Sequence, residues 1–287
     1  AFGECISLKE IDLPSSVEFI GSYCFDGCKS LEQIIIPSAL IKIEKSTFEK
    51  CKSLKRVYAN SSNLTIIDTQ AFYQCPLLEH ITIPSSVTFI GNFAFGECSY
   101  LAELTLPPSI TSIEVNTFFN CESLKEMIIP PSVTKIAYSS FRGCTSLTEI
   151  KIPPSVTFVD GNAFYGCSSL KQVEIPSSIP KICAYSFYEC ASLEQIKIPT
   201  SITCIGKEAF FGCSSLCQVD FEEPSSLEEI EDGAFGDCAS LKKIPLPSSI
   251  KQIGKNAFPK TEVSQKWVNF LMQNIFILYK FIYQMKK

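Results

Sequence analysis

Apolar and polar residues follow one another along most of this chain in a single unit that returns about every 23 residues. The unit reads F-x-x-C-x-x-L-x-x-I-x-[IL]-P-x-S-[IV]-x-x-I-x-x-x-x, and its marker phenylalanines are 23 residues apart except for gaps of 24 before Phe72 and 25 before Phe235. A fixed period of this length is typical of a repeat architecture rather than of separate globular domains. The markers are Phe2, Phe25, Phe48, Phe72, Phe95, Phe118, Phe141, Phe164, Phe187, Phe210, Phe235 and Phe258.

Each unit predicts a short strand, a stop and a second extended segment. In the unit that begins at Phe95, Leu104 and Leu106 alternate with Glu103 and Thr105, as residues on the two faces of a strand do. Two prolines follow, and proline ends a strand because it cannot donate to the ladder. Two isoleucines then predict an extended or turn-like segment, so one unit makes one turn of a coil.

A single turn cannot fold alone, because burying its few apolar side chains releases less free energy than ordering its backbone costs. Stacking the turns adds hydrogen bonds between strands and buries both faces of each coil. We therefore expect residues 1–261 to form one β-rich solenoid of about twelve turns with a parallel sheet along one side. Because the chain begins inside a repeat, we also expect a piece of a longer array.

The unit resembles the leucine-rich repeat of the Treponema pallidum type, found in BspA-like surface proteins. The segment LEHITIPSSVTFIGNFAFGEC, residues 78–98, carries the resemblance, and nearly every unit to about residue 260 matches. Residues 58–67 and 221–227 depart from the pattern. The resemblance implies an α/β-type repeat solenoid, curved and right-handed. It also implies a non-enzymatic protein at the cell surface or secreted, which binds host matrix or other cells.

Composition agrees with a binding role for proteins and disfavours two other classes. A net charge of −5 argues against nucleic acid as a partner. The single histidine, His80, has only glutamate and threonine near it in the sequence, so we expect no catalytic site and no cofactor. An intracellular scaffold in the cytoplasm is the alternative, because unpaired cysteines suit a reducing compartment.

Fifteen cysteines raise the question of disulfides or metal. Most stand three residues after a marker phenylalanine, where a stack would align their side chains in parallel rather than toward each other. We expect buried free thiols whose S–H groups help to satisfy backbone carbonyls. Zinc is disfavoured because no histidine accompanies the C-x-x-x-C spacings, so no metal is predicted. The structural file is Cys28, Cys51, Cys75, Cys98, Cys121, Cys144, Cys167, Cys190 and Cys213; Cys24, Cys183, Cys204 and Cys217 lie off it.

Outward strand positions are the candidate partner-binding residues. Glu103, Glu126 and Glu149 follow one another in one outward file, and Thr105 and Lys151 lie in the next. The acidic file is either a solvated stripe, eased by nearby lysines, or a docking patch for a basic partner or a divalent cation.

Aromatic residues give a second candidate surface. Phe119, Tyr165, Tyr188 and Phe211 occupy the position after the marker phenylalanine, where other units carry glycine or charged residues. Exposed aromatic files mark interfaces, but such rings also pack between neighbouring turns.

Two further features concern the compartment. Asn60 and Asn63 begin acceptor sequons for glycosylation in the most irregular unit. Residues 262–287 leave the repeat, and their apolar spacing of three to four predicts a capping helix. A membrane anchor is the rival interpretation, although the segment is short and polar for a span. Membrane association is expected only through this segment or through parts of the protein outside this sequence.

Overall fold

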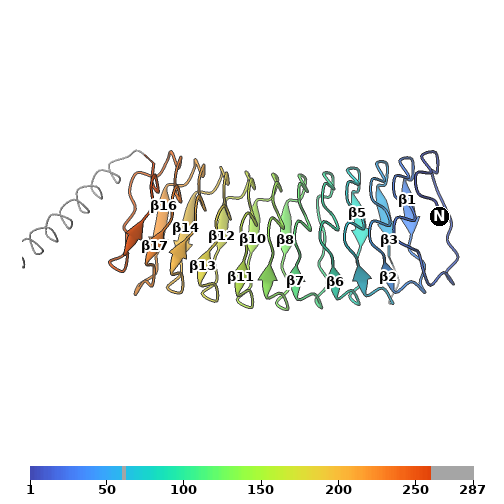
Figure 1. Ribbon diagram of the computed structural model, residues 1–287, viewed down its shortest axis with the longest axis horizontal. Helices are drawn as coiled ribbons and strands as arrows, with labels where there is room; N and C mark the ends of the chain where they lie inside the picture. Colours follow the sequence, from blue (N-terminus) through green and yellow to red (C-terminus); the bar gives the residue numbers. More distant parts are fainter. Residues whose placement is uncertain (60–62, 260–287) are drawn as a thin grey trace, which may run out of the picture.

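A computed structural model describes residues 1–59 and 63–259, which form one elongated solenoid with Ala1 at one end (Figure 1). The parallel β-solenoid is confirmed. Within the described ranges the chain contains no helix, so the α component of the expected α/β type has no counterpart there. Accordingly, no described segment is a helix of the length and apolar character that a membrane crossing requires. Asn60 and the expected capping helix at 262–287 lie outside the described residues.

Strands run along two faces of the solenoid, and all paired strands are parallel. Pairing joins equivalent positions of successive units, such as Glu149 with Gln172 and Lys135 with Phe158. Among the described residues eight turns carry a strand on the first face and ten on the second, slightly fewer than the twelve turns expected. The first face holds β1 (Gln33–Ile35), β3 (Arg56–Tyr58), β5 (His80–Thr82), β8 (Glu126–Ile128), β10 (Glu149–Lys151), β12 (Gln172–Glu174), β14 (Gln195–Ile198) and β16 (Gln218–Phe221). The second holds β2 (Lys42–Ile43), β4 (Ile66–Ile67), β6 (Phe89–Ile90), β7 (Ser112–Ile113), β9 (Lys135–Ile136), β11 (Phe158–Val159), β13 (Lys181–Ile182), β15 (Cys204–Ile205), β17 (Glu229–Ile230) and β18 (Gln252–Ile253).

The ladder on each face is interrupted twice, so the strands fall into three blocks along the chain. The blocks contain β1 to β6, β7 to β12 and β13 to β18. On the second face, the break between β11 and β13 has a local cause: Pro180 has no N–H, whereas Thr157 at the same position of the preceding unit donates its N–H to the Thr134 carbonyl. At the first interruption the strand expected at residues 103–106 is absent; these residues form no ladder with β5 or β8.

The marker phenylalanines form the spine of the core. All twelve rings stack in one column, with neighbouring centroids 5.2–5.8 Å apart and ring planes within 17° of parallel. The ten inner rings are fully buried, whereas Phe2 at the N-terminal end is 39% exposed because it has a neighbour on one side alone. The column runs through both interruptions, so it joins the three blocks into one core.

Left-handed backbone conformations flank each marker. For Phe187, these are Tyr185 and Glu189, with φ of 60° and 55°. The N–H groups of all three residues donate to the next turn, with N···O distances of 2.9, 2.8 and 2.7 Å. A side chain in this conformation costs on the order of 1–2 kcal/mol. Only five of the 22 described residues with positive φ are glycine, so the hydrogen bonds between turns have to offset that cost.

We expect the phenylalanine column to dominate stability. Phe164→Ala removes a fully buried ring that stacks on both sides, and it should lower the free energy of unfolding by about 3–5 kcal/mol. Urea unfolding followed by circular dichroism measures this change. Phe158→Ala is the matched control, because its ring on the second face is 41% exposed. Equal losses in the two variants would contradict a stability that depends on the column.

Candidate functional site

The acidic file lies on the first face with its carboxylates free. Glu126 and Glu149 are register partners in β8 and β10, and Glu103 precedes them by one turn. All three are exposed, and within the described part of the chain their side chains form no hydrogen bond or ion pair, not even with Lys125 or Lys151. Two unit charges about 5 Å apart repel by about 0.8 kcal/mol in water and by roughly four times as much at an effective dielectric near 20. The file therefore favours a cation beside it.

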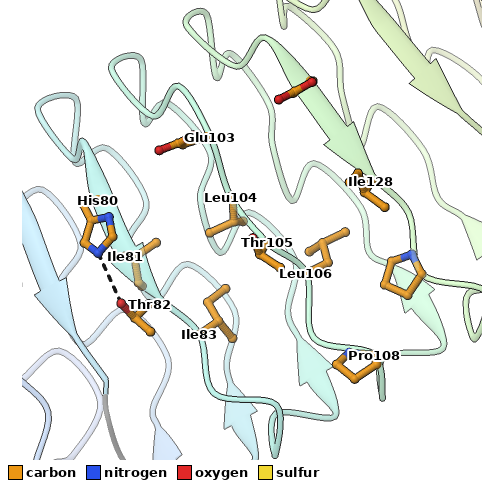
Figure 2. Close-up of a pocket in the computed structure, with 12 residues that line it drawn as sticks. His80, Ile81, Thr82, Ile83, Glu103, Leu104, Thr105, Leu106, Pro108 and Ile128 are labelled. Atoms are coloured by element: carbon orange, nitrogen blue, oxygen red, sulfur yellow. Dashed lines mark hydrogen bonds between the residues drawn. The ribbon is translucent and has the colours of Figure 1, made fainter.

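A groove of about 600 Å³ lies on the first face where the ladder is interrupted, and we call it the central groove. Figure 2 shows that residues of three successive turns line it, with the first of the acidic residues, Glu103, on one turn and Ile128 on the next. Ile128 is 83% exposed, whereas Leu104 and Leu106 are buried. The groove thus combines carboxylates with apolar surface. Its lining is His80, Ile81, Thr82, Ile83, Glu103, Leu104, Thr105, Leu106, Pro108, Glu126, Ile128 and Pro130.

The backbone beneath this groove keeps its polar groups free. Along residues 103–106 no N–H or carbonyl group takes part in a hydrogen bond with any described residue. In the regular turns these groups bond to both neighbouring strands, as in β10 between β8 and β12. The outward residue Thr105 is exposed at this point. The interruption could not be predicted from the sequence, because Leu104 and Leu106 alternate with polar residues as strand residues do in the other units.

His80, at the edge of the central groove, does not complete a catalytic arrangement. Its Nε2 lies 3.2 Å from the Thr82 hydroxyl, and its ring is 6.3 Å from that of Tyr58. The hydroxyl lies within reach of the imidazole, but no described carboxylate forms a hydrogen bond to the ring and orients it, so a triad is not formed.

The aromatic candidates form a packed column at one edge of the solenoid. Tyr188 stacks on Tyr165 with centroids 4.6 Å apart and on Phe211 at 5.2 Å. Arg142 continues the column, with its guanidinium 4.5 Å from the Tyr165 ring and 5.9 Å from Phe119. These residues are half-buried, and their ring faces are covered by each other. The arrangement supports packing between turns, and Arg142 is a member that the aromatic pattern alone did not indicate.

The cysteine file links each turn to the one before it. Ten thiols donate to the carbonyl of a marker phenylalanine 26 to 28 residues earlier, at 3.0–3.3 Å. Except at Phe72, the same carbonyl also accepts the N–H of the cysteine in its own turn, so Phe25 O accepts from both Cys28 N–H and Cys51 S–H. Burial raises the pKa of Cys167 to about 12, which keeps it a thiol. All fifteen cysteines are free, and the file ends in Cys238.

One cysteine off the file belongs to a polar cluster on the second face. The sulfur of Cys204 lies 3.4 Å from a Glu231 carboxylate oxygen and 3.9 Å from one of Glu229. These three residues have the composition of a metal site. However, the Lys181 ammonium group lies 3.0 Å from Glu231, and that hydrogen bond raises the lysine pKa. An ion pair between turns accounts for the cluster.

Of the two sequons, only Asn63 lies among the described residues. It is exposed, and its side-chain amide donates to the Ser38 carbonyl at 3.2 Å. Its use as a glycosylation site stays a prediction.

Thiol reactivity should follow burial. We expect Cys5 and Cys217, which are exposed, to react rapidly with Ellman's reagent in the native protein, and half-buried Cys24 and Cys183 to react more slowly. The other eleven should react only after unfolding, and raising the pH from 7 to 9 should not release them because burial holds the pKa of Cys167 and Cys238 near 12. Rapid native reaction of more than four thiols would be inconsistent with the buried file.

The aromatic column should contribute to stability and not to adhesion. Tyr188→Ala removes two stacked contacts and should lower the free energy of unfolding by about 1–3 kcal/mol. Tyr100→Ala is the control, since Tyr100 is 57% exposed and has no ring contact with a described residue. Cell binding that falls in Tyr188→Ala while its stability equals that of Tyr100→Ala would assign the column to a partner instead.

Comparison with known proteins agrees with this architecture. The family model described as "BspA type Leucine rich repeat region (6 copies)" matches residues 1–88, 65–190 and 139–264. A leucine-rich cell surface protein from Faecalibacterium prausnitzii is 31% identical, with 86% of this chain and 75% of that chain covered and a TM-score of 0.60. A leucine-rich repeat protein from Bacteroides ovatus is 26% identical over 85% and 80%, with a TM-score of 0.57. The leucine-rich repeat protein of T. pallidum is 31% identical over 54% and 72%, with a TM-score of 0.50.

No curated protein sequence matches this chain. The family model alone spans nearly all of the described solenoid, and the similar structures reproduce its stacked turns. The chain therefore belongs to the BspA-type leucine-rich repeat family.

Proposed function

We propose that this chain is a non-enzymatic binding domain, displayed at the cell surface or secreted, which attaches to matrix proteins or to other cells through its first face. The observation that carries the proposal is the run of exposed residues Glu103, Glu126 and Glu149, whose carboxylates have no partner among the described residues. A rigid solenoid presents such residues at a fixed spacing of about 4.8 Å.

The similar structures support the surface location. The protein from F. prausnitzii is described as a leucine-rich cell surface protein. The central groove supplies carboxylates and apolar side chains together, which suits a protein partner better than a charged polymer alone. Thr105 and Lys151, which lie in the next outward file, extend the same surface.

An intracellular scaffold is the second candidate, and the free cysteines favour it. None of the fifteen thiols is in a disulfide, as is usual in a reducing compartment. Eleven of them are nevertheless buried, and burial protects a thiol from oxidation in any compartment. The thiols are therefore compatible with display, and the two candidates differ in location rather than in the binding face.

Antibody labelling of intact and permeabilised source cells tests the location. We expect labelling of intact cells, because the proposal places the solenoid outside. Labelling that requires permeabilisation would exclude display and favour the scaffold.

Binding of the purified chain to immobilised matrix proteins and to cells tests the face. Glu126→Gln should weaken attachment several-fold, whereas Glu189→Gln, an exposed acidic residue at the aromatic edge, should not. Equal attachment of both variants and the original chain would remove the acidic file from the binding surface.

A further inference from the structure

We propose that the central groove binds an extended segment of a partner protein that carries lysine or arginine at one position and an aliphatic residue two positions later. This inference rests on the proposed protein-binding function and specifies the chemistry of the partner.

The charge on the groove selects a cation. Glu103 and Glu126 come from successive turns, and neither carboxylate has a partner among the described residues. A lysine or arginine side chain between them gains two attractive contacts and offsets their mutual repulsion. An acidic or neutral ligand has neither gain.

The apolar surface fixes the second ligand position. On β8, Glu126 and Ile128 both point outward, separated by one residue, and Ile128 is 83% exposed. Residues i and i+2 of an extended ligand also face the same side, about 6.6–7 Å apart. A ligand that places its cation at Glu126 therefore places its next inward side chain on Ile128. An aliphatic residue there removes exposed apolar surface from water.

The free backbone favours an extended ligand over a helical one. Residues 103–106 leave their peptide N–H and carbonyl groups unbonded at the interruption of the ladder. An extended segment has free backbone groups of its own, whereas a helix uses them internally. The three features coincide at this point of the first face, where Figure 2 shows Glu103, Thr105 and Ile128 around one hollow.

Titration with synthetic peptides tests the motif. The probe is an eight-residue peptide, Thr-Lys-Thr-Leu-Thr-Lys-Thr-Leu, titrated into the ¹⁵N-labelled chain. We expect it to bind at least tenfold more tightly than the same peptide with glutamate in place of lysine. It should also bind at least tenfold more tightly than Lys-Lys-Thr-Thr-Thr-Thr-Leu-Leu, which has the same composition but no leucine two positions after a lysine.

Variants on the first face locate the site. Glu126→Gln and Ile128→Ser should each weaken binding at least fivefold. Glu174→Gln and Ile35→Ser are matched controls, because both residues are exposed on the same face outside the groove, and they should leave affinity unchanged. Hydrogen exchange of the amides at 103–106 should slow when the peptide is bound.

Absence of binding, equal affinity for the three peptides, equal effects of the two variant pairs, or unchanged exchange at 103–106 would each overturn the proposal. Attachment of the whole chain to cells is measured separately. If attachment persists while the peptide test fails, the proposed function stands and this groove is not its site. If attachment also fails, both fall.

Discussion

The contact between one marker phenylalanine and the next is the interaction on which the rest of this solenoid depends. Each ring stacks on its neighbour with centroids 5.2–5.8 Å apart, and two kinds of hydrogen bond join the surrounding backbone of one turn to the next. Around Phe187, backbone N–H groups reach forward to the next turn, and the thiol of Cys213 returns to its carbonyl. The column therefore fixes how successive turns stack, and the strands on both faces follow that stacking.

Continuity of this column explains how the ladders can be interrupted without dividing the molecule. Where β5 and β8 fail to join through residues 103–106, the Phe95 and Phe118 rings still stack at 5.8 Å, and Phe95 N–H still bonds to Thr117. At Pro180 the ladder of the second face is interrupted as well, and the Phe164 and Phe187 rings still stack there at 5.3 Å. Strand pairing is thus the variable part of the architecture, and the phenylalanine column is the constant part.

The period, the buried file and the outward positions could be predicted from the sequence because each depends on which side chains repeat. Phe164, Cys167 and Leu170 are buried, and Gln172 is exposed, as their phase requires. The left-handed backbone conformations could not be predicted from the pattern of side chains. Positions such as Tyr185 and Glu189 carry no glycine signal, since their conformation follows from hydrogen bonds to the neighbouring turn.

The same limit applies to the candidate site. The acidic file follows from the sequence because Glu103, Glu126 and Glu149 share one phase, whereas the central groove depends on how three successive turns lie against one another. Leu104 and Leu106 alternate as strand residues do, and the loss of their ladder is a property of the spacing between turns. The covered faces of Tyr165 and Tyr188 likewise depend on contacts between units that a single unit does not contain.

The thiol bonds connect each turn to its immediate predecessor alone, as Cys121 bonds to Phe95 and Cys144 to Phe118. A turn therefore carries within itself everything needed to join an existing end. Duplication or loss of one 23-residue unit in the gene would lengthen or shorten the rod by one step of about 5 Å and leave the other turns in place. Gain or loss of a repeat can in this way change the length of the protein while each remaining surface keeps its own chemistry.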